Sequence, residues 1–221
     1  LFRCVNEPLL TIGVEICEDL WVADPPSTRL AQGGATLLLN PSASDETVCK
    51  DAYRRTLLEA TSGRLVCGYV YADAGWGESS TDLIYAGHSL IAENGTILAE
   101  RRFATGLTIT EIDLQKLAHE RQRMTTYPAD APDLYPNYFE LECTETRLTR
   151  PIAPNPFVPA DHGDRAARCQ EILPLSALGL KKRLAHTGAR TAVVGLCGGL
   201  DSTLALLITA RAMAMLDRPM T

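Results

Sequence analysis

The 221-residue sequence has no closely paired cysteines, no clustered histidines and no long apolar run, and each absence excludes a class of protein. Its seven cysteines are spread singly along the chain, without the spacing typical of zinc sites or disulfide frameworks. The four histidines are isolated as well, so we predict no metal site. No apolar run reaches the roughly 18 residues that a membrane span needs. Unpaired cysteines without a signal pattern favour a cytoplasmic location.

The charge pattern also limits the partners. The formal net charge is −6, and both signs are scattered along the chain rather than gathered in a basic stripe. We therefore expect neither nucleic acid nor a membrane as a partner. The hydrophobic content of 46% supports a sizeable core. Because the chain starts at Leu1 rather than Met and stops soon after a predicted helix, we expect both ends to be cut.

The first stretch of interest leads to Cys17. Residues 9–16 are mostly apolar and lack proline, which predicts a strand buried on both faces. Glu18 and Asp19 follow, and such acids are typical of the first turn of a helix. Cys17 would therefore lie on a strand-to-helix corner, where backbone amides favour the nucleophilic thiolate. A small, inert core cysteine is the alternative interpretation.

A βαβ unit surrounds this corner. A short helix at 28–32 and an apolar strand at 35–39 follow, so the two strands should be parallel neighbours. Because open α/β sheets bind ligands beyond the carboxyl ends of their strands, we expect Cys17 to lie near the loop 40–44. Ser44 in that loop is either a substrate contact or the N-cap of a helix predicted at 46–61.

The composition changes along the middle of the chain, from predicted strands and helices to a proline-rich stretch. We predict a strand at 64–72, a polar glycine-rich loop at 73–82, a hairpin around Asn94-Gly95, and a helix at 111–125. Eight of the thirteen prolines then lie between residues 128 and 174. Such density predicts an extended arm rather than helix or central strand.

A second group of residues follows the arm. We predict a helix at 175–186, a buried strand at 191–195 and a helix at 202–216. Glycines between the last strand and helix let backbone N–H groups converge on a phosphate, and nearby acid and hydroxyl groups could serve a metal ion and phosphate oxygens. The spacing fits neither a Walker A loop nor G-x-G-x-x-G, and a purely structural turn is the alternative. The candidate residues are Cys197, Gly198, Gly199, Leu200, Asp201 and Ser202.

Together, the two groups resemble the glutamine-dependent NAD synthetase family. GVEICEDLW, NPSAS, GESSTD and AGHSLIAENGTILAE are similar to the nitrilase-like glutaminase domain of that family, and GLCGGLDST resembles the pyrophosphate loop of ATP pyrophosphatases. The resemblance covers most of residues 1–125 and again 175–221. It implies an α/β chain with part of a nitrilase-like αββα sandwich at 1–125 and a Pro-rich linker arm at 126–174. The first helix-strand-loop-helix of a Rossmann-like ATP pyrophosphatase domain would occupy 175–221.

The resemblance also implies a reaction. Cys17 would attack the side-chain amide of glutamine, with Ser44 near the bound glutamine. The ammonia would pass to a second site, where ATP with Mg²⁺ adenylylates nicotinic acid adenine dinucleotide, yielding NAD, AMP and pyrophosphate. Residues 197–202 would hold the ATP. No tightly bound cofactor is implied, and the intact enzyme is expected to be a homo-oligomer.

Two departures from the family pattern carry expectations of their own. The general base and the catalytic lysine of the family precede the nucleophile by far more than the 16 residues present here, and the first lysine is Lys50. We therefore expect no glutaminase turnover from this chain alone. Cys197 replaces the serine of the loop pattern, which weakens one phosphate contact. The rival functions are a nitrilase-like amidase without ligase activity and an inactive nucleotide-binding product.

Overall fold

The computed structural model describes residues 1–79, 81–128, 134–142, 144 and 147–218. The chain forms two compact units, Leu1–Arg150 and Pro151–Thr221, which are described separately. The candidate site at Cys17 lies in the first unit, and the glycine-rich loop lies in the second.

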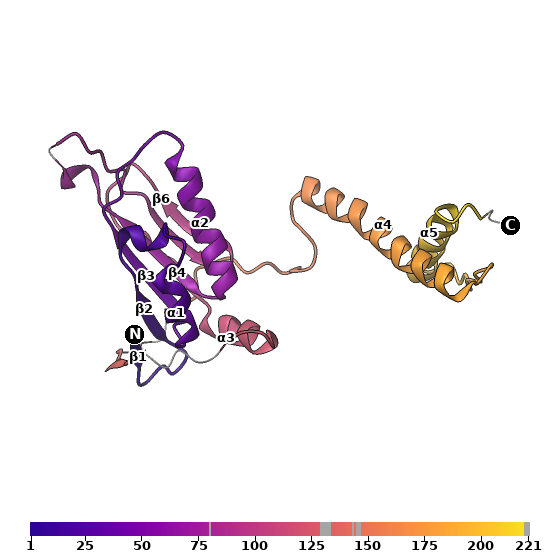
Figure 1. Ribbon diagram of the computed structural model, residues 1–221, viewed down its shortest axis with the longest axis horizontal. Helices are drawn as coiled ribbons and strands as arrows, with labels where there is room; N and C mark the ends of the chain where they lie inside the picture. Colours follow the sequence, from indigo (N-terminus) through magenta and orange to yellow (C-terminus); the bar gives the residue numbers. More distant parts are fainter. Residues whose placement is uncertain (80, 129–133, 143, 145–146, 219–221) are drawn as a thin grey trace. The chain divides into compact units, whose positions relative to one another are not determined.

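The first unit is built on a mixed seven-stranded sheet (Figure 1). Its spatial order is β6-β5-β4-β3-β2-β1-β7. β2, β3 and β4 run parallel, as do β1 and β7, while the other neighbouring pairs are antiparallel. The strands are β1 (Phe2–Cys4), β2 (Thr11–Val14), β3 (Leu37–Ser42), β4 (Gly68–Asp73), β5 (Ser89–Glu93), β6 (Thr96–Arg101) and β7 (Asn137–Phe139).

Two helices connect the parallel strands, as the βαβ pattern predicts. α1 (Pro26–Gln32) joins β2 to β3, and α2 (Lys50–Leu65) joins β3 to β4. Because both crossovers step in the same direction across the sheet, right-handed connections place both helices on one face. α3 (Leu114–Arg123) follows the hairpin β5–β6. The ends of these elements differ from the predicted ends by a few residues, and the nitrilase-type α/β fold that the sequence predicts is confirmed for this unit.

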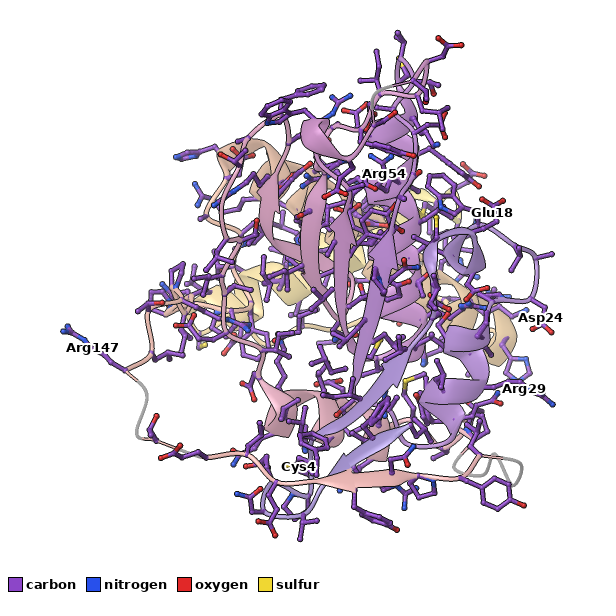
Figure 2. All side chains as sticks on the ribbon, turned by 90° about the vertical axis from the view of Figure 1, so that its left-hand side faces the viewer. Cys4, Glu18, Asp24, Arg29, Arg54 and Arg147 are labelled. Carbon is purple, nitrogen blue, oxygen red and sulfur yellow. The ribbon has the colours of Figure 1, made fainter. Side chains whose placement is uncertain are left out.

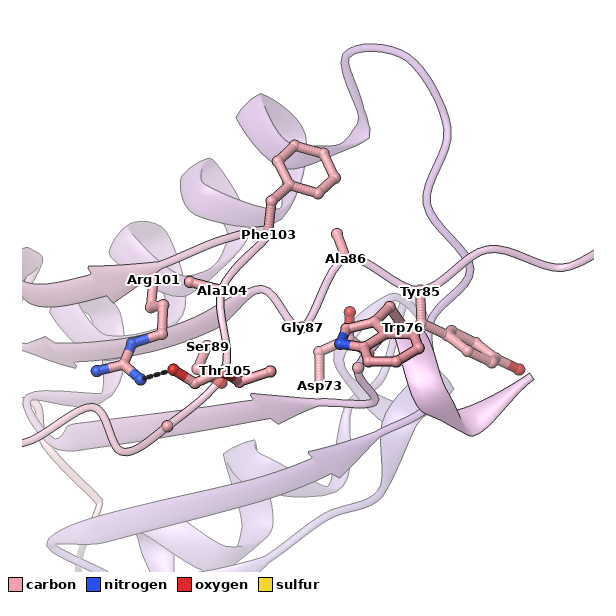
Figure 3. Close-up of a pocket in the computed structure, with 12 residues that line it drawn as sticks. Asp73, Trp76, Tyr85, Ala86, Gly87, Ser89, Arg101, Phe103, Ala104 and Thr105 are labelled. Carbon is pink, nitrogen blue, oxygen red and sulfur yellow. Dashed lines mark hydrogen bonds between the residues drawn. The ribbon is translucent and has the colours of Figure 1, made fainter. Parts of the chain in front are cut away.

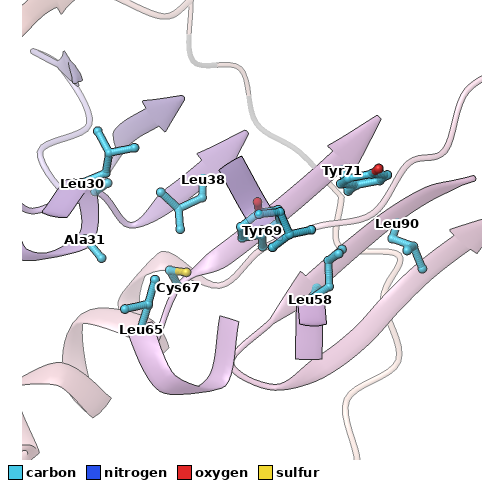
Figure 4. Packing of buried hydrophobic residues seen from close by; sticks show 12 residues of the cluster. Leu30, Ala31, Leu38, Leu58, Leu65, Cys67, Tyr69, Tyr71 and Leu90 are labelled. Carbon is cyan, nitrogen blue, oxygen red and sulfur yellow. The ribbon is translucent and has the colours of Figure 1, made fainter. Parts of the chain in front are cut away.

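The core lies between the two crossover helices and the sheet (Figure 4). Leu30 of α1 and Leu58 of α2 pack with Leu38, Tyr69 and Tyr71 of the strands. Side chains alternate along each strand, so the residues between these core positions face the other side of the sheet.

The prediction that β2 is buried on both faces is therefore wrong. Thr11 and Glu15 are buried, whereas Val14 and Ile16 are 38% and 62% exposed. The apolar run hides this alternation because its outward positions carry apolar side chains too. The hairpin prediction is confirmed, since Asn94 and Gly95 have φ values of 45° and 85° between β5 and β6.

The second unit consists of α4 (His162–Thr187) and α5 (Leu200–Ala214), which pack through Ala177, Leu184, Ala212 and Met213. The arm predicted up to residue 174 is wrong in its last part, because α4 begins at His162. Seven of the eight prolines precede His162, and Pro174 alone lies inside the helix. A single proline removes one helical hydrogen bond without preventing the rest of the helix.

The strand predicted at 191–195 is also wrong. These residues form no strand, and Val193 is 96% exposed. A strand needs a neighbour to pair with, and the described residues of this unit contain no other strand. The Rossmann-like part of the predicted fold is therefore not confirmed. Within the described part of the chain, no helix combines the length and hydropathy needed to cross a membrane.

Candidate active site

Cys17 lies on the predicted corner directly after β2. Ile16 is extended, with φ −127°, while Cys17 itself has a left-handed φ of 51°. The chain then enters η1 (Cys17–Leu20), a 3₁₀ helix, so the predicted helix is a single short turn. Asp19 stabilises it, because its carboxylate accepts a hydrogen bond of 2.7 Å from the N–H of Ile16. The Cys17 side chain is half-buried rather than sealed in the core.

Asn40 joins this corner to the neighbouring strand. Its Oδ1 accepts from the Cys17 N–H at 2.9 Å, and its Nδ2 donates to the Cys17 carbonyl at 3.4 Å. The prediction that Cys17 lies near residues 40–44 is thereby confirmed. Residues 40–42 belong to β3 rather than to a loop, however, because they keep pairing with Tyr71, Ala72 and Asp73 of β4.

A buried polar chain supports Asn40. Asn40 Nδ2 also donates to the Tyr69 hydroxyl at 3.2 Å, and that hydroxyl donates a short hydrogen bond to Glu15. The other carboxylate oxygen of Glu15 accepts from the Ser27 N–H at 2.7 Å. Burial raises the pKa of Tyr69, and the neighbouring Glu15 charge raises it further, so the phenol stays protonated. The sequence analysis did not predict these buried hydrogen bonds, although a carboxylate within an apolar run indicates that a polar partner is buried beside it.

Ser44 is buried beyond the end of β3. Its N–H donates to Asp73 Oδ1 at 2.9 Å, and its hydroxyl accepts from Arg54 Nη2 at 3.4 Å. The alternative that Ser44 caps a helix is wrong, because α2 begins later and its N-cap is Cys49. Contact with a substrate stays a prediction.

Arg54 is the centre of a buried charged cluster, hereafter the Arg54 cluster. The guanidinium lies inside the first unit, whereas Glu18 lies at its periphery (Figure 2). It donates to Glu46 at 3.0 Å and to His88 Nδ1 at 2.8 Å. Burial of these charges is tolerated because they are paired. The cluster comprises Glu46, Asp51, Arg54, Asp73, His88, Glu100 and Arg102.

Asp73 connects this cluster to a pocket of about 430 Å³ (Figure 3). Aromatic rings of Trp76, Tyr85 and Phe103 line it, together with Arg101. Arg101 donates to the Thr105 carbonyl at 2.8 Å, so this cation is held against its own loop. Neither Cys17 nor Ser44 lines this pocket, so the pocket and the Cys17 corner are separate features. The predicted glycine-rich loop that leads into it contains residue 80, which lies outside the described residues.

The second predicted group forms an exposed loop before α5. Gly198 has a φ of 82°, and a Cβ there would meet open space. Cys197 Sγ lies 3.5 Å from Ser202 Oγ, and the hydroxyls of Ser202 and Thr203 donate to the Gly199 carbonyl. The contact with Ser202 lowers the pKa of Cys197, and a backbone hydrogen bond from Gly199 lowers it further. Asp201 lies in the first turn of α5. In the described ranges, no three acidic, histidine or cysteine side chains converge as a metal site would need.

Residues 2–122 match the sequence profile of the carbon-nitrogen hydrolase family. The glutamine-dependent NAD(+) synthetase of Mycobacterium leprae is 40% identical over 231 aligned residues, which cover 99% of this chain and 34% of that protein. The deaminated glutathione amidase of Mus musculus is 34% identical over 132 aligned residues, covering 59% of this chain and 40% of that protein.

Among solved structures, a glutamine-dependent NAD(+) synthetase from Cytophaga hutchinsonii is 36% identical, with a TM-score of 0.38. That match covers 46% of this chain and 16% of the other. The chain spans about a third of the length of the M. leprae synthetase that it matches.

Proposed function

Because the chain belongs to the carbon-nitrogen hydrolase family, we propose that Cys17 attacks glutamine and that the full-length protein uses the released ammonia to form NAD. The resemblance to synthetases across both units carries this proposal. The M. leprae synthetase matches 99% of the chain, including the loop before α5, whereas the mouse amidase matches 59%. A reaction that needs both units accounts for the longer match.

The glutaminase step is assigned to the corner after β2. The Cys17 thiolate attacks the side-chain amide carbon of glutamine, the carbon–nitrogen bond breaks, and protonated nitrogen leaves as ammonia. Water then hydrolyses the thioester to glutamate and restores the thiol. The half-buried position of Cys17 and its left-handed backbone support this role, because they place the sulfur outside the apolar core. Ser44, which the Arg54 cluster holds in place, is proposed to contact glutamine.

The ligase step is assigned to the loop before α5. The carboxylate of nicotinic acid adenine dinucleotide attacks the α-phosphorus of ATP, and pyrophosphate leaves. Ammonia then attacks the adenylylated carbonyl carbon, AMP leaves, and NAD results. Backbone N–H groups of residues 197–200 would face the phosphates, with Asp201 on the accompanying Mg²⁺ and Ser202 on a phosphate oxygen. The open backbone at Gly198 supports this role.

Two alternatives remain distinct from this proposal. A nitrilase-like amidase would hydrolyse its amide without ATP, and an inactive product would bind nucleotide without turnover. The mouse relative, an amidase by name, gives the first alternative its support. Homo-oligomerisation and cytoplasmic location stay predictions from the sequence.

Product analysis of the full-length protein separates the three. With glutamine, ATP, Mg²⁺ and nicotinic acid adenine dinucleotide, the proposal predicts NAD, AMP and pyrophosphate in equal amounts. Ammonia release that needs no ATP, without NAD, would identify the amidase. Calorimetric binding of ATP with no product at all would identify the inactive protein.

A further inference from the structure

Cys17 has a backbone conformation that its own side chain does not favour. A residue with a Cβ rarely adopts a left-handed φ, and Cys17 has a φ of 51°. The surrounding structure must therefore hold it there. Asp19 holds the adjoining Ile16 N–H, and a contact to the Cys17 backbone itself would act on the strained residue directly.

Asn40 supplies that contact on both sides of the residue. Its Oδ1 accepts from the Cys17 N–H at 2.9 Å, and its Nδ2 donates to the Cys17 carbonyl at 3.4 Å. A carboxamide combines one acceptor and one donor on a single planar group. An aspartate in its place would turn an oxygen toward the Cys17 carbonyl, and an alanine would reach neither atom.

The orientation of the Asn40 amide is fixed by groups behind it. Ser42 Oγ donates to Asn40 Oδ1 at 2.8 Å, while the hydroxyl of Tyr69 accepts from Asn40 Nδ2 at 3.2 Å. Tyr69 in turn donates to Glu15. Asn40, Tyr69 and Glu15 are 1%, 0% and 2% exposed, so water does not replace these partners. Exchanging the oxygen and nitrogen of the amide would set a donor against the Cys17 N–H and an acceptor against the Cys17 carbonyl.

We propose that Asn40 is a positioning residue, which clamps Cys17 in its left-handed conformation and so keeps the sulfur at the carboxyl edge of β2. Its role in catalysis rests on the proposed function, because it acts through Cys17 and not on the substrate. These hydrogen bonds hold the Cys17 backbone in its conformation before glutamine binds. Their loss should therefore lower kcat for glutamine and leave KM nearly unchanged.

The first test measures amide hydrogen exchange of Cys17 by NMR in the unmodified chain. The clamp predicts a Cys17 amide that exchanges at least about tenfold more slowly than an unstructured amide, since a hydrogen bond must open first. Exchange at the unstructured rate would overturn the proposal, and this result needs no variant to fold.

The second test compares Asn40→Asp and Asn40→Ala with Ser42→Ala, which leaves both contacts to Cys17 in place. Asn40→Ala should speed Cys17 exchange by about five- to tenfold, the effect of losing an ordinary hydrogen bond. Asn40→Asp keeps an acceptor for the Cys17 N–H, and Ser42→Ala keeps both contacts, so both should change the exchange by less. Iodoacetamide labelling with peptide mapping should show a changed rate at Cys17 and an unchanged rate at the exposed Cys49. Circular dichroism verifies folding of each variant. Unchanged exchange and labelling of Cys17 in a folded Asn40→Ala variant would overturn the clamp.

The kinetic test separates this proposal from the proposed function. In the full-length protein, Asn40→Asp should lower kcat with glutamine by about tenfold and leave the rate with ammonium unchanged. If Cys17→Ala itself leaves glutamine-dependent activity intact, the proposed function fails, yet the exchange measurements still decide whether Asn40 holds the corner. If Asn40→Asp raises KM alone, the positioning role is wrong.

Discussion

Arg54 Nη1 donates a hydrogen bond to His88 Nδ1 across 2.8 Å, and this contact fixes the protonation of the imidazole. Because a guanidinium can only donate, Nδ1 must accept, and the proton lies on Nε2, which faces Glu100 Oε1 at 2.8 Å. Burial lowers the pKa of His88 to about 4, and the neighbouring Arg54 charge acts in the same direction. Glu46 and Asp51 oppose this shift, and Arg102 reinforces it.

Stability should therefore fall as the pH drops from about 6.5 toward 4. In this range the unfolded chain binds a proton at residue 88 that the folded chain excludes, so protonation favours unfolding. One such group contributes up to about 1.4 kcal/mol per pH unit to the slope of the unfolding free energy. Below pH 4 the folded state is protonated as well, and this contribution levels off.

Urea denaturation at a series of pH values checks this expectation. His88→Asn keeps an acceptor for Arg54 but no longer titrates, so the slope between pH 6.5 and 4 should become shallower. The exposed His119→Asn is the matched control and should keep the slope of the unmodified chain. An unchanged slope in His88→Asn would contradict the assignment.

The ion pair of Glu93 and Arg150 should contribute strongly to the first unit. Arg150 donates to both carboxylate oxygens, at 2.7 and 2.8 Å, and the Glu93 side chain is 1% exposed. Arg150→Ala should lower the unfolding free energy by about 3 kcal/mol, because it leaves a buried carboxylate whose other partners among the described residues are Lys116 and a backbone N–H. Arg123→Ala breaks an exposed pair with Glu120 and should cost about 0.5 kcal/mol or less. Equal losses in the two variants would contradict the distinction between buried and exposed pairs.

Cys197 should weaken ATP binding relative to serine. A thiol is a poorer donor than a hydroxyl, and a thiolate repels phosphate. In the full-length protein, Cys197→Ser should tighten ATP–Mg²⁺ binding by about three- to tenfold. The thiolate fraction of Cys197 grows with pH, and its lowered pKa moves this growth to lower pH, so the advantage of serine should widen as the pH rises. Calorimetry measures both effects, with the exposed Cys169→Ser as control. Equal affinities at every pH would remove this loop from the ATP site.

The sequence could predict the parts of this fold that depend on local signals. Asn94-Gly95 marks the hairpin by its own backbone preference, and the βαβ spacing predicts which strands are adjacent. The Arg54 cluster could not be predicted in this way. Arg54 and Arg55 are neighbours on one helix, yet only the packing of α2 on the sheet decides that Arg54 is buried beside His88.

In the second unit, by contrast, a local signal predicts a strand that the structure does not form. The apolar run at 191–195 has the composition of a strand, but a strand forms only when a neighbour satisfies its backbone, and the described residues of that unit include none. The candidate Cys17 corner was predictable because a cysteine and two acids end an apolar run. Its partner Asn40 was predictable only as a neighbour, since two hydrogen bonds to one backbone residue depend on the register between β2 and β3.

Removal of the Cys17 thiol tests the central claim most directly. In the full-length protein, Cys17→Ala should lower NAD formation from glutamine by at least about a thousandfold, because no nucleophile remains. NAD formation from ammonium chloride should stay within about twofold of the unmodified protein, since it bypasses Cys17, and Cys49→Ala should leave both activities intact. Glutamine-dependent NAD formation that survives in Cys17→Ala would contradict the account, and so would loss of both activities in a folded variant.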